Sequence, residues 1–329
     1  MSATYLMPTY NRQPISFTRG AGSWLYTKDD TPYLDALTGI AVCGLGHCHP
    51  QVTDAIQQQA GTLIHTSNLF GIDWQERAGE ILCTAAQMDS VFFANSGAEA
   101  NEAALKLARL YAYKQGFKRP KVIVMEQSFH GRTLLSLSAT ANPKAREGFY
   151  TLDEDFIRVP FGNIEAVKQA AQEHDDICAI FVEPIQGEGG LNTAANGFTY
   201  LEDLQAECDA HNWLFMLDEV QTGNGRTGRY FAYQHSNARP NGFPVGACMV
   251  RGRANGLFGA GSHGSTYGGT PLASRVVHSV YDVLANSNIM ENAVTEGLFI
   301  RESIVDTFGQ HGVSSRGAGM MIGIALADH

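Results

Sequence analysis

Short apolar runs alternate along the chain with stretches whose apolar residues recur at helical spacing. The runs predict strands at Val91–Ala94, Val122–Met125, Ile177–Val182, Leu214–Leu217 and Val245–Val250. The helical patterns cover Glu99–Tyr113, Ile164–Gln172 and Tyr200–His211. Strands that alternate with helices are typical of an α/β fold, with a mostly parallel central sheet and helices on both faces. Because ligands bind at the carboxyl ends of such strands, the residues after each run are the first place to look for a site.

The two ends of the chain are organised differently from its middle. Residues 1–60 predict an extended segment with a hairpin around Asp29–Asp30, and a helical pattern after residue 285 precedes the strand-like run Gly317–Leu326. We expect an N-terminal segment of residues 1–60, a large domain of residues 61–284 and a C-terminal segment of residues 285–329. The first and last would form a smaller domain, which we expect to be truncated because the chain stops at His329.

Composition and charge narrow the range of functions. The chain has 329 residues, of which 44% are apolar and 17% charged, and its formal net charge is -10. This negative balance argues against a nucleic-acid binder, which needs clustered Lys and Arg. No stretch approaches the roughly 20 apolar residues that span a bilayer, and residues 1–20 lack the apolar core of a signal peptide. We therefore expect a cytoplasmic protein without a membrane or nucleic-acid partner.

The cysteines do not suggest a disulfide framework, because the six are scattered at positions 43, 48, 83, 178, 208 and 248. One cluster has metal-ligating chemistry: Cys43, His47, Cys48 and His49. No second cluster completes a four-ligand set. We favour a turn packed by the neighbouring glycines and expect no metal.

The first polar segment after a strand is Asn95–Glu102. Ser96 and Glu99 have the spacing of a capping box, which starts a helix. Gly97 and Ala98 then lie in the first turn, where free backbone N–H groups and the helix dipole suit a phosphate. The alternative is a capped helix with no ligand.

The second and third segments follow the next two predicted strands within the large domain. In Ser128–Thr133, the Phe129 ring is suited to stacking on a planar ring, and Arg132 is suited to a bidentate carboxylate contact. Glu183–Gly190 places two carboxylates, one of them Glu188, in a glycine-rich turn. An ordinary polar loop and a turn cap are the alternatives.

The fourth and fifth segments are Asp218–Gln221 and His263–Gly269. An acid at the end of a buried strand is costly unless it is paired, and a protonated pyridine nitrogen is a suitable partner for Asp218. The fifth segment offers hydroxyl groups and flexible backbone that suit a phosphate. A turn cap and a simple glycine-rich loop are the alternatives.

A dinucleotide site is not supported, although Gly223–Gly228 fits the pattern G-x-G-x-x-G. Such a site needs an acidic residue about 20 positions further on. No Asp or Glu occurs between Val220 and Tyr281, and the residues after the motif do not open a convincing helix. We therefore reject NAD as a ligand.

The order of these motifs is more specific than any one of them. The series NSGAEANEAALK, FHGRT, VEPIQGEGG, LDEVQTGNGRTG, NGFPVGA and HGSTYGG, preceded by YLDALTGIAVCGLGHCHP, resembles the class III pyridoxal 5'-phosphate (PLP) aminotransferases over nearly the whole chain. The resemblance is closest to the acetylornithine group, with ornithine and succinylornithine enzymes as alternatives. It implies the type I PLP-dependent transferase fold and a homodimer with shared active sites.

The resemblance also implies roles for individual residues. Gly97 and Ala98 would bind the cofactor phosphate, Phe129 would stack on the ring, and Asp218 would pair with its nitrogen. Gln221 would approach the ring hydroxyl, and Arg132 would bind a substrate carboxylate. Glu188 would be a gate residue that pairs with an Arg near the C-terminus. Ser265 and Thr266 would reach into the partner subunit's site, where Thr266 would bind the phosphate.

The implied reaction passes the ω-amino group of N-acetylornithine to 2-oxoglutarate, a step of arginine synthesis. It needs a lysine that forms a Schiff base with the cofactor and moves the proton to and from the substrate carbon. The family's lysine segment is absent here, because Pro240 runs directly into Asn241 and the last lysine is Lys168. Arg239 is no substitute, since its guanidinium stays protonated. The expected partner of Glu188 is also absent.

Three interpretations of this joint remain open. In the first, the sequence omits residues that the protein contains; in the second, the chain is a deletion variant; in the third, it is a natural non-catalytic relative. We favour the first, because the loss of a central strand should be severely destabilising. For the chain as written we predict no appreciable transamination. Another PLP reaction, such as decarboxylation or amino migration, and non-enzymatic PLP binding are the competing functions.

Overall fold

The central element of the fold is a seven-stranded sheet. The structure is a computed structural model and describes residues 5–244 and 246–326. The strand order is β4-β10-β9-β8-β7-β5-β6. Among the described strands of this sheet, only β10 runs antiparallel to its neighbours, so the sheet is mostly parallel as predicted. The strands are β4 (Ser90–Phe93), β5 (Lys121–Met125), β6 (Phe156–Val159), β7 (Ile177–Val182), β8 (Leu214–Leu217), β9 (Gly242–Pro244) and β10 (Ala247–Val250).

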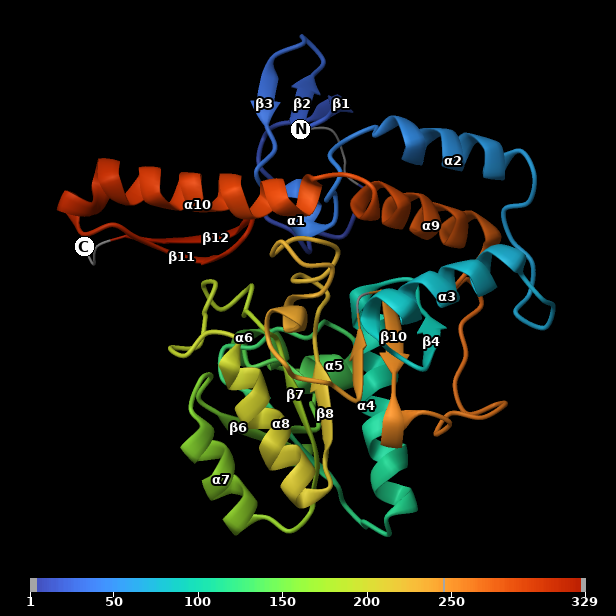
Figure 1. The fold of residues 1–329 in the computed structure, drawn as a ribbon, viewed down its shortest axis with the longest axis vertical. Coiled ribbons are helices and arrows are strands. Elements are labelled where there is room, and N and C mark those ends of the chain that lie inside the picture. The colour runs from blue at the N-terminus through green and yellow to red at the C-terminus, as the bar shows by residue number, and fades with distance from the viewer. Residues whose placement is uncertain (1–4, 245, 327–329) are drawn as a thin grey trace.

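Helices cover both faces of this sheet, because successive strand residues point to opposite sides. In β5, Ile123 and Met125 pack in one core with α7 and α8, while Val122 and Val124 pack in a second core with α4 and α5. Figure 1 shows these four helices around the strands of the sheet. These helices are α4 (Gly97–Lys114), α5 (Leu134–Ala139), α7 (Ile164–Glu173) and α8 (Thr199–His211). The predicted α/β class and the three predicted helices are therefore confirmed.

The N-terminal segment forms a separate small sheet, at the top of Figure 1. The predicted hairpin is confirmed, since β2 and β3 pair antiparallel around a turn in which Asp30 has φ 63°. Its elements are β1 (Phe17–Ala21), β2 (Trp24–Thr27), β3 (Pro32–Leu34), α1 (Thr38–Ala41) and α2 (Pro50–Ala60). Helix α2 packs against α9 (Pro271–Ala285), and α9 packs against α3 (Asp73–Ala86).

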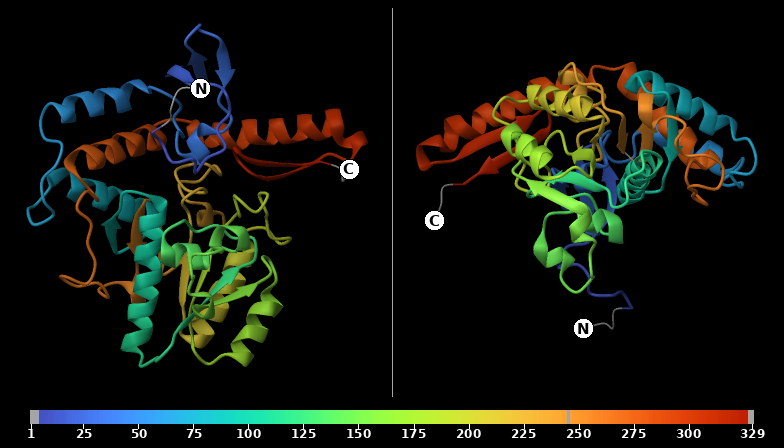
Figure 2. Two further views of the ribbon diagram at one scale, coloured as in Figure 1. Left: turned by 180° about the vertical axis from the view of Figure 1, so that it is seen from behind. Right: turned by 90° about the horizontal axis from the view of Figure 1, so that it is seen from below.

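The C-terminal segment is a long helix, α10 (Ile289–Phe308), with a two-stranded sheet packed along it. Both views of Figure 2 show this unit projecting from the rest of the molecule. The strand-like run predicted at Gly317–Leu326 contains β12 (Met321–Ala325), so the strand is confirmed but its start is not. Gly317 and Ala318 end a preceding strand, β11 (Ser314–Ala318), and the chain reverses at Gly319 with φ 54° to form a hairpin. The division into a large domain and a smaller composite domain stays a prediction.

Two strands of the central sheet, β6 and β9, were not predicted. β9 begins directly after the joint between Pro240 and Asn241, and it pairs with β8 on one side and β10 on the other. The expected loss of a central strand therefore does not open the sheet. The strand predicted at Val245–Val250 begins at Ala247, and Val245 lies outside the described residues.

The remaining described elements are short. They are α6 (Pro143–Arg146) and 3-10 turns at Asp153–Asp155, Ala232–His235, Gly252–Ala254 and Gly309–His311. None of the helices within residues 5–244 and 246–326 is both long and apolar enough to cross a membrane.

Candidate functional site

Loops from separate strands meet at the carboxyl edge of the central sheet. A Cβ atom on Gly97 would lie 2.6 Å from Val220 Cγ1, so the start of α4 touches the loop after β8. A Cβ atom on Gly131 would lie 3.0 Å from the Cβ of Ala98, so the loop after β5 reaches the same place. The Gln221 amide lies directly against Gly187 in the loop after β7. The structure thus brings together the first four polar segments singled out in the sequence.

Asp218 lies at the centre of this meeting point, at the end of β8, and is only 4% exposed. Its Oδ2 accepts hydrogen bonds from Asn101 Nδ2 and from His130 Nδ1, each at 2.8 Å. Its Oδ1 accepts one hydrogen bond, from the Val220 N–H at 3.1 Å. A carboxylate oxygen has room for a second donor, so Oδ1 can still pair with a ligand N–H.

The sequence assigned no role to Asn101 and noted His130 only as an imidazole in the second polar segment, yet these two side chains hold Asp218. Asn101 is 2% exposed and also donates to the His130 carbonyl at 2.6 Å, while the His130 ring stacks on Phe181 with 4.3 Å between centroids. Among the described residues, His130 Nε2 and Asn101 Oδ1 are buried without a hydrogen-bond partner. The available signal was an amide side chain on the alanine-rich buried face of α4.

Glu183 joins two of the loops. It is 6% exposed, and its carboxyl oxygens accept the N–H groups of Phe129 and Gly187, both at 3.2 Å. Burial, followed by the charge of Asp218, raises the pKa of Glu183 well above its usual range. Glu183 therefore ties the Phe129 loop to the glycine-rich loop that carries Glu188.

Glu219 acts as a cap inside the protein. Its carboxyl group is fully buried and accepts hydrogen bonds from Thr222 Oγ1 and from the N–H groups of Ala232 and Tyr233. Burial raises the pKa of Glu219 to about 7, against the lowering effect of these hydrogen bonds. For the segment Asp218–Gln221, a turn cap was the alternative to a ligand contact. Glu219, the neighbour of Asp218, is such a cap.

The start of α4 has the features of an anion site. The Ser96 Oγ accepts the Glu99 N–H at 3.2 Å, which confirms Ser96 as the cap. The reciprocal half of the predicted capping box differs, because the Glu99 carboxylate accepts the N–H of Asn95 rather than that of Ser96. First-turn N–H groups have no acceptor within a helix, so those of Gly97 and Ala98 are available to a ligand.

Phe129, Arg132 and Glu188 line one cavity of about 420 Å³ beside this centre. The Arg132 guanidinium carbon lies 5.7 Å from the Phe129 ring centroid. Arg132 and Glu188 are exposed, whereas Phe129 is half-buried. The predicted cofactor and substrate residues of these two loops therefore share one opening to solvent.

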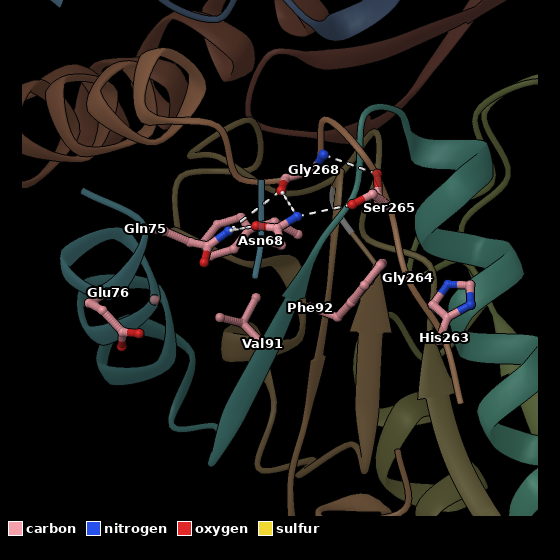
Figure 3. A pocket seen from close by; sticks show the side chains of 11 residues that line it. Asn68, Gln75, Glu76, Val91, Phe92, His263, Gly264, Ser265 and Gly268 are labelled. Atoms are coloured by element: carbon pink, nitrogen blue, oxygen red, sulfur yellow. Dashed lines mark hydrogen bonds between the residues drawn. The ribbon is translucent and has the colours of Figure 1, made fainter. Parts of the chain in front are cut away.

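The fifth segment lies on the other side of α4, next to β4. The Ser265 Oγ accepts hydrogen bonds from Asn95 Nδ2 and the Gly268 N–H, both at 2.9 Å. Asn68 lies in the loop between α2 and α3. Figure 3 shows its side chain turned toward Ser265 and Gly268, whose carbonyl oxygens accept hydrogen bonds from the Asn68 amide. Thr266 is exposed and lines a neighbouring cavity of about 370 Å³. Ser265 is thus engaged within its own chain.

No lysine reaches Asp218 in the part of the chain that the structure describes. Lys106 Nζ lies 2.8 Å from His263 Nδ1, Lys121 pairs with Asp176 at the amino end of β5, and Lys168 pairs with Glu165. The other four lysines are exposed: Lys28, Lys114, Lys118 and Lys144. Arg239 is exposed as well, and its N–H donates to the Gln205 side chain.

The cluster from Cys43 to His49 does not form a metal centre in the described structure. Across residues 5–244 and 246–326, no group of three or more His, Cys, Asp or Glu side chains is arranged to hold a metal ion. His47 instead pairs with Asp35, with 2.7 Å between Nε2 and Oδ2. The G-x-G-x-x-G segment Gly223–Gly228 forms turns and does not open a helix.

Comparisons with known proteins agree with this arrangement. A family model described as aminotransferase class-III matches residues 5–329. An acetylornithine aminotransferase of Nitrosomonas europaea is 48% identical, over 98% of this chain and 85% of that protein. Their alignment extends over 340 residues, which exceeds the 329 residues of this chain, so it leaves residues of the relative without a counterpart here.

Solved structures give the same result. An acetylornithine aminotransferase of Elizabethkingia anophelis superposes with a TM-score of 0.86 and 31% identity, over 98% of this chain and 82% of that one. An ornithine aminotransferase of Toxoplasma gondii, with PLP at partial occupancy in its active site, superposes with a TM-score of 0.89 and 31% identity. That match covers 96% of this chain and 78% of the other.

Proposed function

The chain belongs to the class III aminotransferases, and we propose that its site is built to pass the ω-amino group of N-acetylornithine to 2-oxoglutarate. The products would be N-acetylglutamate semialdehyde and glutamate. The names of its relatives support the amino donor. A place in arginine synthesis and in the cytoplasm is part of the same proposal. The observation that carries the proposal is the buried Asp218, held by His130 and Asn101 beside the open first turn of α4.

The residues present fit the non-covalent contacts of the cofactor. Class III aminotransferases depend on PLP, which when bound draws electrons from a substrate carbanion into its ring. Asp218 would pair with the ring nitrogen, for which its Oδ1 retains an acceptor site. The first-turn N–H groups of Gly97 and Ala98 would hold the phosphate, and Phe129 would cover one face of the ring.

The other side chains would orient the ligands. Gln221 would approach the ring hydroxyl, Arg132 would bind a substrate carboxylate through its guanidinium fork, and Glu188 would act as the gate. Arg316, near the end of the described chain, binds the carbonyl oxygens of Gly190 and Leu191, two and three residues after Glu188. Its guanidinium is therefore committed to the backbone of the gate loop.

The chain as written lacks the amine that the reaction needs. No lysine lies at Asp218 within the described residues, so the site offers no amine that would bind the cofactor covalently or move a proton to and from the substrate carbon. We therefore propose that this chain binds PLP reversibly and does not catalyse appreciable transamination. The matched experiment inserts the lysine-bearing segment of the Nitrosomonas relative between Pro240 and Asn241 and measures glutamate formed from N-acetylornithine and 2-oxoglutarate.

The insertion separates the competing functions. Turnover by the restored chain, with none by the parent, supports the proposal. Turnover without 2-oxoglutarate, or release of carbon dioxide, would favour a different PLP reaction. Preference for ornithine or succinylornithine as amino donor would identify that compound as the substrate instead. Absence of all turnover after restoration of the segment would contradict the proposed transamination.

We also propose that two copies associate and share their sites, as the resemblance implies. Leu69 and Phe70 are 89% and 68% exposed, and Tyr267, next to Thr266, is 62% exposed. The two segments lie side by side, because Asn68 binds the carbonyl oxygens of Ser265 and Gly268. Large exposed apolar side chains that gather in one place are typical of protein interfaces. If a second copy covers these side chains, Thr266 would lie near the cofactor phosphate in the site of that second copy.

A further inference from the structure

The cavity beside Phe129 is lined by polar side chains to which the family resemblance assigns no role. Besides Arg132 and Glu188, it is lined by the amide side chains of Gln127 and Asn142. Both amides are exposed to the cavity mouth, and each has one oxygen acceptor and one nitrogen donor. Which of the two groups remains available decides what kind of ligand the cavity accepts.

Asn142 presents a donor. It caps the short helix α6, and its Oδ1 accepts the N–H of Lys144 at 3.0 Å. A backbone N–H only donates, so the atom facing it has to be the amide oxygen. The Nδ2 group of Asn142, with two hydrogens, is left for the cavity.

Gln127 also presents a donor, fixed by a chain of contacts. Asn192 Nδ2 lies 3.1 Å from the Gly189 carbonyl, which only accepts, so this atom of Asn192 has to be its nitrogen. The same nitrogen lies 2.7 Å from Gln127 Oε1. The Gln127 oxygen is therefore occupied, and its Nε2 group has no hydrogen-bond partner among the described residues. Gln127 has φ 61°, an unusual value for a residue other than glycine, which indicates that its position is imposed by the surrounding loops.

We propose that Gln127 and Asn142 recognise the acyl carbonyl oxygen of the substrate and so select an N-acylated amino acid over one with a free α-ammonium group. This inference rests on the proposed function, since it needs the α-carboxylate to lie at Arg132. Two amide donors beside a guanidinium suit a carbonyl acceptor. An ammonium group has only donors and a positive charge, and it would face both the amide hydrogens and Arg132.

Glu188 carries the one carboxylate among the described residues that line this cavity, and a carboxylate attracts an ammonium ion. Its side chain is exposed, and water screens the attraction between exposed charges. It also suits the N–H of an acylated amine, which it can accept as a hydrogen bond. The cavity therefore favours N-acetylornithine over ornithine. With N-acetylornithine, the amide N–H groups of Gln127 and Asn142 gain an acceptor, whereas with ornithine they stay unpaired, and both effects contribute to the discrimination.

The test uses isosteric changes that keep each structural hydrogen bond and reverse the group facing the cavity. In Asn142→Asp a carboxylate oxygen still accepts from the Lys144 N–H, and in Gln127→Glu one still accepts from Asn192. The matched control is Asn163→Asp, which adds the same charge at another helix cap, where Oδ1 accepts the Ala166 N–H at 3.1 Å outside this cavity.

Equilibrium dialysis measures the dissociation constants of N-acetylornithine and ornithine. The chain is saturated with pyridoxine 5'-phosphate, which has no aldehyde, so that neither amine reacts. We expect the parent and Asn163→Asp to bind N-acetylornithine more tightly than ornithine. Each cavity variant should shift the ratio of the two constants toward ornithine by about tenfold, the size of one exchanged hydrogen bond.

An unchanged ratio in both cavity variants, with both ligands still bound, would overturn the inference and leave the proposed function standing. If the parent binds neither ligand, the inference falls together with the proposed function. Thermal melting reports whether each variant folds, and Gln127→Glu decides the question if Asn142→Asp does not fold.

Discussion

His130 Nδ1 lies 2.8 Å from Asp218 Oδ2 in the interior of the protein, and the two residues are 88 positions apart in the chain. His130 is 1% exposed, and its ring is fixed against Phe181. The imidazole thereby holds one oxygen of the carboxylate in place and leaves the other oxygen to the Val220 N–H and a ligand. This pair links the FHGRT motif to the DEVQ motif at the point where both would meet the cofactor ring.

The first prediction concerns the carboxylate itself. Asp218→Asn keeps the size of the side chain but removes the charge that would pair with a protonated ring nitrogen. PLP affinity should fall by roughly tenfold or more, since hydrogen bonds between charged groups are about twice as strong as neutral ones. Fluorescence titration with PLP measures this, with Asp209→Asn on the exposed face of α8 as the control.

The second prediction concerns the imidazole. His130→Ala leaves one oxygen of Asp218 with a single donor, Asn101, so we expect PLP to bind roughly tenfold more weakly. Removal of a buried ring should also lower the melting temperature. His211→Ala, at an exposed position where the ring stacks on Trp213, is the comparison. Unchanged PLP affinity in a folded His130→Ala chain would contradict a positioning role for His130.

The third prediction follows from the buried cap Glu219, whose pKa is raised from 4.5 to about 7. The unfolded chain releases this proton near pH 4.5, whereas the folded chain keeps it until about pH 7. Stability from this group is therefore complete below pH 4.5 and declines until the pH passes about 7, by about 3 kcal/mol in total. Glu219→Gln, whose amide stays neutral at every pH, should lose this slope. Urea unfolding across that pH range provides the comparison, and equal slopes would contradict the assignment.

The fourth prediction tests the association of two copies. Leu69→Asp should shift the equilibrium from dimer to monomer without lowering the free energy of unfolding of the monomer, because Leu69 is 89% exposed in the single chain. Light scattering after size-exclusion chromatography, over a range of concentrations, measures the change. Tyr113→Asp, at an exposed position near the end of α4, is the control. A parent chain that is monomeric at all concentrations would end this part of the proposal.

The sequence predicted those parts of the site in which the signal is local. Asp218 and Phe129 each follow a predicted strand, and strand ends at one edge of a parallel sheet converge. The contact between His130 and Asp218 could not be predicted in this way, because it depends on the relative placement of two loops. The alternation that reveals a strand was also missing in β9, where the three residues include a glycine and a proline, both unfavourable in strands.

The structure at the joint between Pro240 and Asn241 could not be predicted from the sequence either. We expected the joint to remove a central strand, but Asn241 lies where it replaces strand contacts: its N–H donates to the Phe215 carbonyl at 2.7 Å, and its side-chain oxygen accepts the Phe215 N–H at 3.0 Å. Its carbonyl also accepts the Arg251 N–H at 2.8 Å. A side-chain amide that substitutes for a backbone partner leaves no pattern in the sequence.

The most direct test of the central claim is the intact mass of the chain after incubation with PLP, borohydride reduction and denaturation. The account predicts that the parent chain retains no stoichiometric cofactor, because no lysine lies at Asp218. The chain with the lysine segment restored between Pro240 and Asn241 should retain one PLP on the inserted lysine. One equivalent bound covalently to the parent at a single lysine, or none on the restored chain, would contradict the account.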